Sequence, residues 1–537
     1  MKVFVTTLLA ITTMILLAVN SSAQVAIGTN GASSHPSAML DIQSTNKGFL
    51  PPRMNYESIL SISNPATGLQ VYDSTYNCIR YYNGAYWVRL VTEVKDPAGF
   101  YGESAIYADG SGQPVYINDI CSDGEGNIYT TGFFQGTAKF GSTTFTSTSG
   151  PDGFIVKYDK NGAVVWARQT TGAGDDVFKS IAWANGNVFV IGEFNGNINI
   201  GNTNLVCTNQ QAISIAKFDA SGNKVWAQSM NGPGVNKPDA VTASPAGNLY
   251  VSCRYVGTSL TVAPGFVLGN SGGSYDAFVA KFNSSGVAQW VKPVAGTQDD
   301  KVLDIVWYNN TIAGTGYFES PSLVMNAFTL TNPGNYGQLL AFKLDENGQT
   351  TWAQHYGIAG THESGKAITA DATGALYIAG EYELGNTVIG SSSLSNAGYA
   401  DGMLVRISPT NTAEAFALRS PSKETVTGVA LVGSYVYISV HSTSPSSFTI
   451  ANKTFPTVNR GGEEVFIARL ISSIPSFENY QQLQQFGGIS HDYTYAMCSD
   501  PALKNVFCVG RSELAPVVFS PNMLYNIGPF IWRYTGE

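Results

Sequence analysis

Acidic residues recur along this chain at a nearly constant interval, and they are its most reactive candidates. Alignment of the first predicted strand of each repeated unit places six residues in one register: Asp176, Asn236, Asp300, Glu363, Glu424 and Asp492. A ring of carboxylates on one face could hold a cation or hydrogen-bond sugar hydroxyls. Alternatively, each acid caps a turn or bonds the backbone of the next unit, and recurrence in nearly every unit favours this structural role.

Two histidines interrupt this regularity, because His362 and His491 directly precede two of the acids. Imidazole and carboxylate groups together can bind a metal ion, but two histidines in similar loops do not define a metal site. The predicted ligand-binding set is therefore Asp176, Asp300, Glu363, Glu424, Asp492, His362 and His491. We predict no catalytic residues, no metal site and no cofactor, with calcium as the one ion that the acids could hold.

The chain lacks the short motifs that mark common active sites. His-Glu-x-x-His, a phosphate loop and a dinucleotide fingerprint are absent from the sequence. Residues 123–127 (DGEGN) resemble a calcium loop but lack its distal glutamate, so a hairpin turn explains them. These absences favour a binding protein over an enzyme. A glycosidase or lyase that uses Asp300 and Glu363 stays open as an alternative.

The elements that position the acids follow from a repeat of apolar residue, Lys or Arg, apolar residue. It occurs at Lys157, Lys217, Lys281, Lys343, Arg406, Arg469 and Arg533, which lie 60 to 64 residues apart. Each unit contains about four strands joined by tight turns and no helical periodicity. This pattern predicts an all-β fold, a seven-bladed β-propeller, over residues 96–537. A solenoid of stacked sheets is the structural alternative.

The two ends of the repeat region complement each other. After Arg533 only four residues remain, so the seventh unit lacks its fourth strand. Residues 100–108 contain one strand without a partner, and an open sheet edge there would promote aggregation. We therefore predict that this N-terminal strand closes the propeller. The aromatic residue that recurs after each landmark, such as Trp166, should fill the space between sheets, although a ligand platform is also conceivable.

The chain begins with the features of a secretory signal. Lys2 precedes an apolar stretch, Val3–Val19, that ends in the cleavage pattern Ser21-x-Ala23. We expect removal of residues 1–23, with no transmembrane segment in the mature chain, and an extracellular or outer cell-surface location. A membrane anchor is the alternative, but the stretch is short for a full span.

Charge and cysteine content narrow the remaining classes. The net charge of -9 and the absence of a Lys/Arg cluster argue against a nucleic-acid partner. Six cysteines in 537 residues are too few for a disulfide scaffold. Cys498 and Cys508 flank a predicted turn at Pro501–Lys504, so they could form a disulfide across a hairpin or remain two buried thiols.

Residues 24–95 form a separate small β-rich module. They contain Val25–Thr29 (VAIGT) and Ala38–Ile42 (AMLDI), followed by further short strands. This sequence pattern resembles a leader module of Bacteroidetes surface proteins and the Ile-Gly-Thr and Leu-Asp-Ile motifs of phage tail-fibre proteins. The resemblance implies attachment or a homotrimer through residues 24–95. A β cap stacked on the propeller is an equal alternative.

The repeat itself resembles a known bacterial propeller repeat, the SBBP type. The resemblance rests on Gly174–Asp176 (GDD) and on Tyr275–Phe282 (YDAFVAKF) followed by Trp290. It implies the fold strongly and the function hardly at all, because propellers serve as enzymes, lectins and scaffolds. We expect a secreted or surface-displayed protein that binds a polysaccharide or protein partner through a propeller face. A structural part of an extracellular assembly or fibre is the alternative from a different class.

Overall fold

In the computed structural model the chain forms two units, Met1–Val94 and Lys95–Glu537. The described residues are 25–28, 35, 37–74, 78–84, 87–90, 101–106, 115–147, 149–269, 274–332, 334, 336–443, 447–450, 453–457, 462–471, 480–486, 491–500, 502–512, 517–519, 522–524 and 528–535. The predicted signal segment, residues 1–23, lies outside them.

The first unit combines a two-stranded and a four-stranded sheet. Its elements are β1 (Val25–Gly28), β2 (Leu40–Gln43), β3 (Arg53–Met54), α2 (Tyr56–Leu60), β4 (Gln70–Asp73), β5 (Cys78–Tyr82) and β6 (Trp87–Leu90). Strands β1 and β2 pair in parallel, and the second sheet has the order β3-β4-β5-β6. Ile59, Val71 and Trp87 form its small core. Arg80 Nε donates to Asp73 Oδ2 at 2.7 Å, so this buried charge is neutralised.

The second unit consists of antiparallel runs of four strands, of which seven can be traced through the described residues. The first four runs are β8 (Val115–Ser122), β9 (Ile128–Phe134), β12 (Asp152–Tyr158) and β13 (Val164–Gly172); β14 (Asp176–Ala184), β15 (Asn187–Phe194), β18 (Ala212–Asp219) and β19 (Lys224–Met230); β20 (Asn236–Ala243), β21 (Leu249–Tyr255), β24 (Asp276–Phe282) and β25 (Ala288–Val294); and β26 (Asp300–Tyr308), β27 (Thr311–Phe318), β30 (Gln338–Asp345) and β31 (Thr350–Tyr356).

The remaining three runs are β32 (His362–Ala370), β33 (Leu376–Glu383), β36 (Ala400–Ile407) and β37 (Ala413–Arg419); β38 (Glu424–Val432), β39 (Tyr435–Thr443), β42 (Glu463–Ile471) and β43 (Tyr480–Phe486); and β44 (Asp492–Asp500), β45 (Asn505–Ser512), β48 (Gly528–Thr535) and β7 (Tyr101–Ile106). The last run takes its fourth strand from the start of the unit, because β7 pairs antiparallel with β48. We number these runs as sheets one to seven.

Short hairpins lie along the chain between the second and third strands of each sheet. They are β10 (Thr137–Phe140) with β11 (Thr143–Thr146), β16 (Asn197–Ile200) with β17 (Thr203–Val206), β22 (Ser259–Ala263) with β23 (Phe266–Gly269), β28 (Ser322–Met325) with β29 (Phe328–Thr331), β34 (Thr387–Ile389) with β35 (Ser392–Leu394), β40 (Ser447–Ile450) with β41 (Lys453–Pro456), and β46 (Val517–Phe519) with β47 (Asn522–Leu524).

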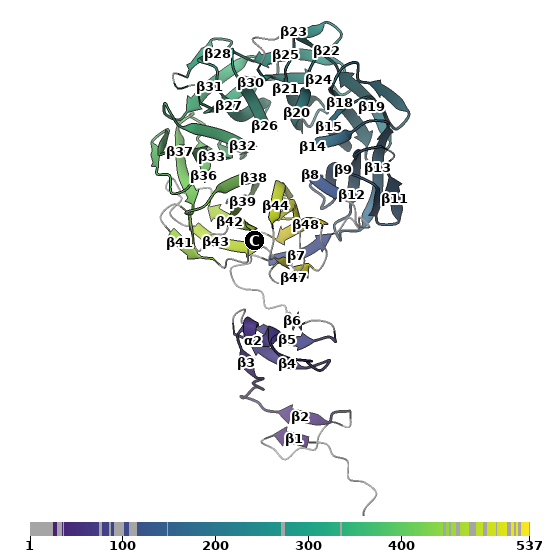
Figure 1. The fold of residues 1–537 in the computed structure, drawn as a ribbon, viewed down its shortest axis with the longest axis vertical. Coiled ribbons are helices and arrows are strands. Elements are labelled where there is room, and N and C mark those ends of the chain that lie inside the picture. Colours follow the sequence, from purple (N-terminus) through teal and green to yellow (C-terminus); the bar gives the residue numbers. More distant parts are fainter. Residues whose placement is uncertain are drawn as a thin grey trace, which may run out of the picture. The chain divides into compact units, whose positions relative to one another are not determined.

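The sheets of the second unit are arranged around a common centre, with the first strand of each sheet innermost (Figure 1). Each innermost strand contacts that of the next sheet, and β44 of the seventh sheet contacts β8 of the first. The prediction of an all-β fold is confirmed.

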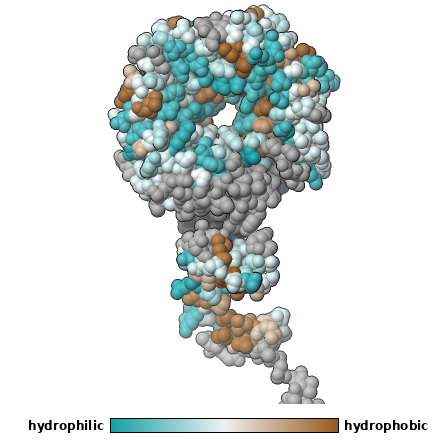
Figure 2. Space-filling model, in the orientation of Figure 1, coloured by the Kyte–Doolittle hydropathy of each residue, from teal (hydrophilic) through white to brown (hydrophobic). Residues whose placement is uncertain are grey.

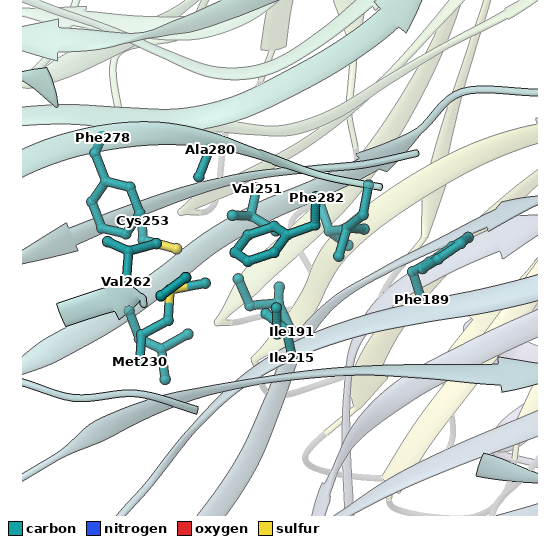
Figure 3. Close-up of a cluster of buried hydrophobic side chains, with 14 of the residues drawn as sticks. Phe189, Ile191, Ile215, Met230, Val251, Cys253, Val262, Phe278, Ala280 and Phe282 are labelled. Atoms are coloured by element: carbon teal, nitrogen blue, oxygen red, sulfur yellow. The ribbon is translucent and has the colours of Figure 1, made fainter. Parts of the chain in front are cut away.

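Apolar side chains from facing sheets form the cores between neighbours. Between the second and third sheets, Phe189 and Ile191 pack with Val251, Phe278 and other buried side chains (Figure 3). Alternate residues of each strand face opposite neighbours, which explains why the third strands are nearly continuous apolar runs.

The recurring tryptophans and lysines join one sheet to the next. Trp290 Nε1 donates to the carbonyl of Glu346 at 3.1 Å, and Lys281 Nζ donates to the same oxygen at 2.9 Å. Lys217 Nζ reaches the carbonyl of Ser284 in the same way at 3.1 Å. These landmark lysines therefore join neighbouring sheets, and the tryptophans fill the space between sheets as predicted.

Gly348→Ala should disrupt one of these joints. A Cβ at Gly348 would lie 2.7 Å from the Trp290 ring, and the backbone φ is +74°. We expect a loss of about 2 kcal/mol in the free energy of unfolding, from strain and overpacking together. Gly186→Ala is the matched control, because its φ is +73° and no atom lies within 4 Å of the added Cβ. Equal losses in urea unfolding would show that the tryptophan joint contributes nothing.

The disulfide considered between Cys498 and Cys508 is absent from the structure, where both are free thiols. The hairpin register pairs Cys498 with Phe507 and Cys508 with Met497. The two cysteines therefore differ by one position in register and project to opposite faces of the sheet. That geometry prevents a disulfide between them.

Candidate functional site

The innermost strands surround a cavity of about 420 Å³. The space-filling view shows this hollow at the centre of the second unit (Figure 2). All seven innermost strands contribute side chains to its lining. A pocket at a shared centre can collect different groups from every sheet, so it is the place where a repeat protein can become specific.

A β-bulge occurs at the same point of every innermost strand. The bulged residues are Asn118, Lys179, Asp239, Leu303, Lys366, Thr427 and Tyr495. Each of them lines the cavity. A bulge adds one residue to the strand and redirects its side chain, so the fold presents one side chain per sheet to the centre. These residues differ in type from sheet to sheet, whereas the structural positions repeat.

Three bulged residues form ion pairs with the second strand of their own sheet. Lys179 Nζ lies 3.7 Å from Glu193 Oε1, and Lys366 Nζ lies 2.8 Å from Glu381 Oε1. Asp239 has the opposite sign and accepts from Arg254 at 2.9 Å. Burial raises the pKa of Asp239 to about 7, although Arg254 opposes this shift. The cavity thus presents charges of both signs.

The residue after the bulge links neighbouring sheets in two places. Asp119 Oδ2 accepts from Ile181 N at 2.9 Å, and Asp304 Oδ2 accepts from Ile368 N at 2.8 Å. Burial raises the pKa of Asp119 to about 6 and that of Asp304 to about 7. These carboxyl groups are committed to backbone donors, so they act chiefly as joints between sheets.

An aromatic group lies where the seventh sheet meets the first. We call it the seam cluster, and it comprises Tyr116, Phe133, His491, Tyr493, Tyr495 and Arg511. The rings of Tyr116 and Phe133 stack at 4.6 Å, and the Arg511 guanidinium lies 4.4 Å from the centre of the Tyr116 ring. Along β44, the rings of His491, Tyr493 and Tyr495 are nearly parallel, with centroids 6.0 and 6.5 Å apart.

The predicted acids begin the innermost strands but lie beneath the surface. Asp176 is 1% exposed, Asp492 2%, and Asp300, Glu363 and Glu424 are fully buried. Their ligand-binding role stays a prediction, and their surroundings favour the structural alternative. The backbone N of Asp176 donates to the carbonyl of Pro151 in the preceding sheet at 2.7 Å, and the same joint recurs at Asp300 and Glu363.

Three of these acids, Asp176, Asp300 and Glu363, face the first residue of a third strand in the preceding sheet. The charge of Asp152 acts on Asp176 and that of Asp276 on Asp300. Burial is the main cause that raises the pKa of Asp176 to about 8, that of Glu424 to about 8, that of Glu363 to about 7 and that of Asp300 to about 6. Two buried carboxyl groups cannot both ionise cheaply, so such a pair tends to retain one proton.

Glu363 is paired with an amide instead of a second carboxyl group. Gln338 Nε2 donates to Glu363 Oε2 at 3.3 Å. Here a neutral donor replaces the protonated carboxyl group of the other pairs. In the second sheet the partner position is Ala212, and the acid of the third sheet is replaced by Asn236. Where the acid is replaced by an amide, its partner carboxyl group is missing as well.

The two predicted histidines lie in different sheets. His362 packs against the Tyr317 ring at 5.1 Å, and its Nδ1 accepts from Gly337 N at 3.2 Å. Burial lowers the pKa of His362, so its imidazole is neutral near pH 7. His491 is exposed and belongs to the seam cluster. Among the described residues, no group of three or more His, Cys, Asp or Glu side chains could hold a metal ion.

Comparisons with known proteins identify part of the chain. Residues 26–105 match the family described as phage tail like trimerisation region. The regulatory protein FlaEY of Caulobacter vibrioides is 24% identical over 352 residues, which span 62% of this chain and 36% of that protein. The match therefore covers only about a third of the length of this relative.

Solved structures of similar fold include β-propeller domains. The propeller domain of the Trilobed protease from Pyrococcus furiosus covers 80% of this chain and 95% of its own, with 8% identity and a TM-score of 0.40. Sqt1 from Chaetomium thermophilum covers 77% and 97%, with 8% identity and a TM-score of 0.37. Within the described part of the chain, none of the helices has the length and apolar character to span a membrane.

Proposed function

We propose that this chain is an exported, non-enzymatic binding protein that carries a closed seven-bladed β-propeller on a trimeric N-terminal module. The apolar stretch Val3–Val19 and the cleavage pattern that follows it support export. Export places the mature chain outside the cell or on its outer surface. Its partner there is a polysaccharide or another protein.

Contacts across the seam support closure of the ring. Strand β48 pairs with β7 from Thr535↔Tyr101 to Ile531↔Ile106. Arg533 donates to the carbonyl of Lys160 in the first sheet at 2.8 Å, which is the joint that Lys217 and Lys281 make elsewhere. This closure gives the last sheet its fourth strand, so β48 is not left as an unpaired edge.

One observation carries the binding role: the residues around the central cavity vary while the joints between sheets repeat. The bulged residues range from Lys179 and Asp239 to Leu303 and Tyr495. Packing between sheets does not require this variety, because the same position tolerates every side-chain class. A recognition surface does require it, since specificity comes from a few polar and aromatic groups placed in a concave site.

A glycan array with the purified mature chain tests this role. We expect selective binding to one group of polysaccharides. A chain that binds no glycan and no extracellular protein would contradict the proposal. In that case the second candidate, a structural part of an extracellular assembly, gains support, because the match to a phage tail like trimerisation region favours it. The glycosidase or lyase alternative gains nothing from Asp300 and Glu363, which are fully buried.

The first unit supports self-association through an uncovered apolar face. Val25 pairs with Leu40 and Ile27 with Ile42, so all four side chains lie on one face of the parallel β1–β2 pair. They are 40 to 55% exposed. A two-stranded sheet is marginal in water, and parallel sheets normally have both faces covered. Three copies that turn this face toward a common axis would cover it.

The double substitution Val25→Asp with Ile27→Asp should convert the trimer to a monomer. Burial of two carboxylates per chain in an apolar interface costs several kcal/mol, and light scattering after size exclusion should report the mass of one chain instead of three. Gln43→Asp adds one negative charge on the opposite face and should leave the mass unchanged. A trimer that persists in the double variant would exclude this face as the interface.

A further inference from the structure

In the seam cluster, aromatic residues occupy a position of the innermost strand that holds an aliphatic, charged or hydroxyl residue in the other sheets. Tyr493 lies two residues before the bulge of its strand, as Tyr116 does in the first sheet. The equivalent residues in the other sheets are Val177, Lys237, Lys301, Ser364 and Thr425. Both aromatic exceptions thus fall in sheets that meet at the seam.

Packing does not explain these exceptions. Serine, threonine and lysine serve the same position in four other sheets, so the fold does not need a large ring there. Tyr116, Tyr493 and Tyr495 are partly exposed, and His491 is exposed. A core aromatic would be buried instead, as Tyr534 of the same sheet is. Partly exposed rings beside a cavity are characteristic of a binding surface.

A positive charge lies within this aromatic surface. Arg511 is opposite Tyr493 in the β44–β45 register, and its guanidinium stacks on Tyr116 and donates to the Tyr116 hydroxyl. Among the described residues no carboxylate forms an ion pair with Arg511. The His441 ring meets Tyr493 edge-on at 5.8 Å, and its own carboxylate neighbour, Glu463, is 3.7 Å away. The cluster therefore offers a guanidinium that is fixed against the face of Tyr116.

Two lysine ammonium groups add positive charge inside the cavity. Tyr495 lines the cavity together with Lys179 and Lys366. Both lysines are partly exposed, at 38% and 30% of their side chains, despite their partners Glu193 and Glu381. A ligand that begins at the seam cluster and enters the cavity would meet aromatic faces first and ammonium groups next.

We propose that the seam cluster binds an acidic polysaccharide through one of its uronic-acid units; this inference rests on the proposed binding function. The apolar C–H face of the sugar ring packs on Tyr493 and Tyr495. Its carboxylate pairs with the planar guanidinium of Arg511, which suits bidentate binding of carboxylates. Neighbouring uronates along the polymer are neutralised by Lys179 and Lys366 at the cavity.

Binding of a short oligogalacturonate to the full mature chain, measured by calorimetry, tests this assignment. The methyl-esterified form of the same oligosaccharide is the matched neutral probe, because it retains the sugar rings and loses the charges. We expect the acidic probe to bind at least about 10-fold more tightly, as the loss of a charged hydrogen bond predicts.

Three variants locate the site. Arg511→Gln should weaken binding of the acidic probe by roughly 10- to 100-fold and leave the esterified probe unaffected. Tyr493→Thr introduces the residue that the sixth sheet carries at the equivalent position, so the fold should be retained while both probes bind more weakly. Tyr399→Thr is the control, since Tyr399 is an 85% exposed aromatic residue just before β36 of the fifth sheet.

The outcomes separate the site from the function. Selective loss in Arg511→Gln and Tyr493→Thr, with Tyr399→Thr unchanged, supports the proposal. Equal affinity for the acidic and esterified probes overturns the uronate assignment. Undiminished binding in both cluster variants overturns the site and leaves the proposed function intact. Failure to bind these probes while the array detects neutral glycans also overturns only the inference, whereas a chain that binds no glycan and no extracellular protein overturns the function with it.

Discussion

Asp500→Ala is expected to lower the free energy of unfolding of the second unit by about 3 kcal/mol, since it removes three hydrogen bonds to a buried carboxylate. Asp500 lies at the end of β44 and is fully buried. Its Oδ2 accepts from Ser122 Oγ at 3.0 Å and from Gly126 N at 2.7 Å, both in the first sheet. Its Oδ1 accepts from Leu503 N at 3.1 Å. This one carboxylate therefore holds the last sheet to the first.

A comparison with Asp219→Ala isolates the contribution of the seam. Asp219 accepts from Ser221 N and Asn223 N, at 2.9 and 2.8 Å, and both donors belong to its own turn. Its loss should be clearly smaller in urea unfolding followed by tryptophan fluorescence. If the two variants lose the same stability, the contact between the seventh and first sheets is not a closing element.

The sequence predicted the repeat because several of its landmarks make the same joint between neighbouring sheets. Lys217, Lys281 and Arg533 all donate to a carbonyl oxygen in the turn of the next sheet. A joint with fixed geometry allows little choice of residue, so the period is visible in the chain. The same reasoning located a strand within residues 100–108, which becomes β7 beside β48.

The bulged residues could not be found in this way. Each lies three residues after the register of the acids, as Lys179 follows Asp176 and Tyr495 follows Asp492. Their types vary, so no pattern of composition distinguishes them. Only the register shift between the first and second strands shows that these side chains face the cavity. The signal for these residues in the sequence is that the residue type varies at one fixed position of an otherwise regular repeat.

For the acids, the sequence predicted the positions but not the surroundings. Their positions were predicted correctly as the beginnings of the innermost strands, but their surroundings depend on a residue about 24 positions earlier. Asp152 faces Asp176, and Gln338 binds Glu363, because the third strand of one sheet begins beside the start of the first strand of the next. Periodicity along the chain does not reveal which residues face each other between sheets.

Buried carboxyl pairs predict that the second unit loses stability as the pH rises. The pKa of Asp176 is raised from 3.8 to about 8, with burial as the first cause and Asp152 as the second. The folded state therefore holds a proton that the unfolded chain releases near pH 4, and stability falls as the pH rises toward 8. Glu424 and Glu363 act in the same direction, with pKa values of about 8 and 7.

Below pH 6.5, a buried histidine changes the stability in the opposite direction. Burial lowers the pKa of His441 to about 4, so the unfolded chain takes up a proton there that the folded chain refuses. Stability from this group increases with pH up to 6.5, the ordinary value. The range from pH 6.5 to 8 therefore reports mainly on the carboxyl groups, and urea unfolding should be compared across it.

Asp176→Asn should flatten this dependence by as much as one proton, or about 1.4 kcal/mol per pH unit. The variant should be more stable than the wild type at pH 8, because an amide beside Asp152 reproduces the neutral partner that Gln338 provides to Glu363. Asp175→Asn is the control, since Asp175 is the exposed neighbour. A slope in Asp176→Asn equal to that of the wild type would mean that this pair holds no shared proton.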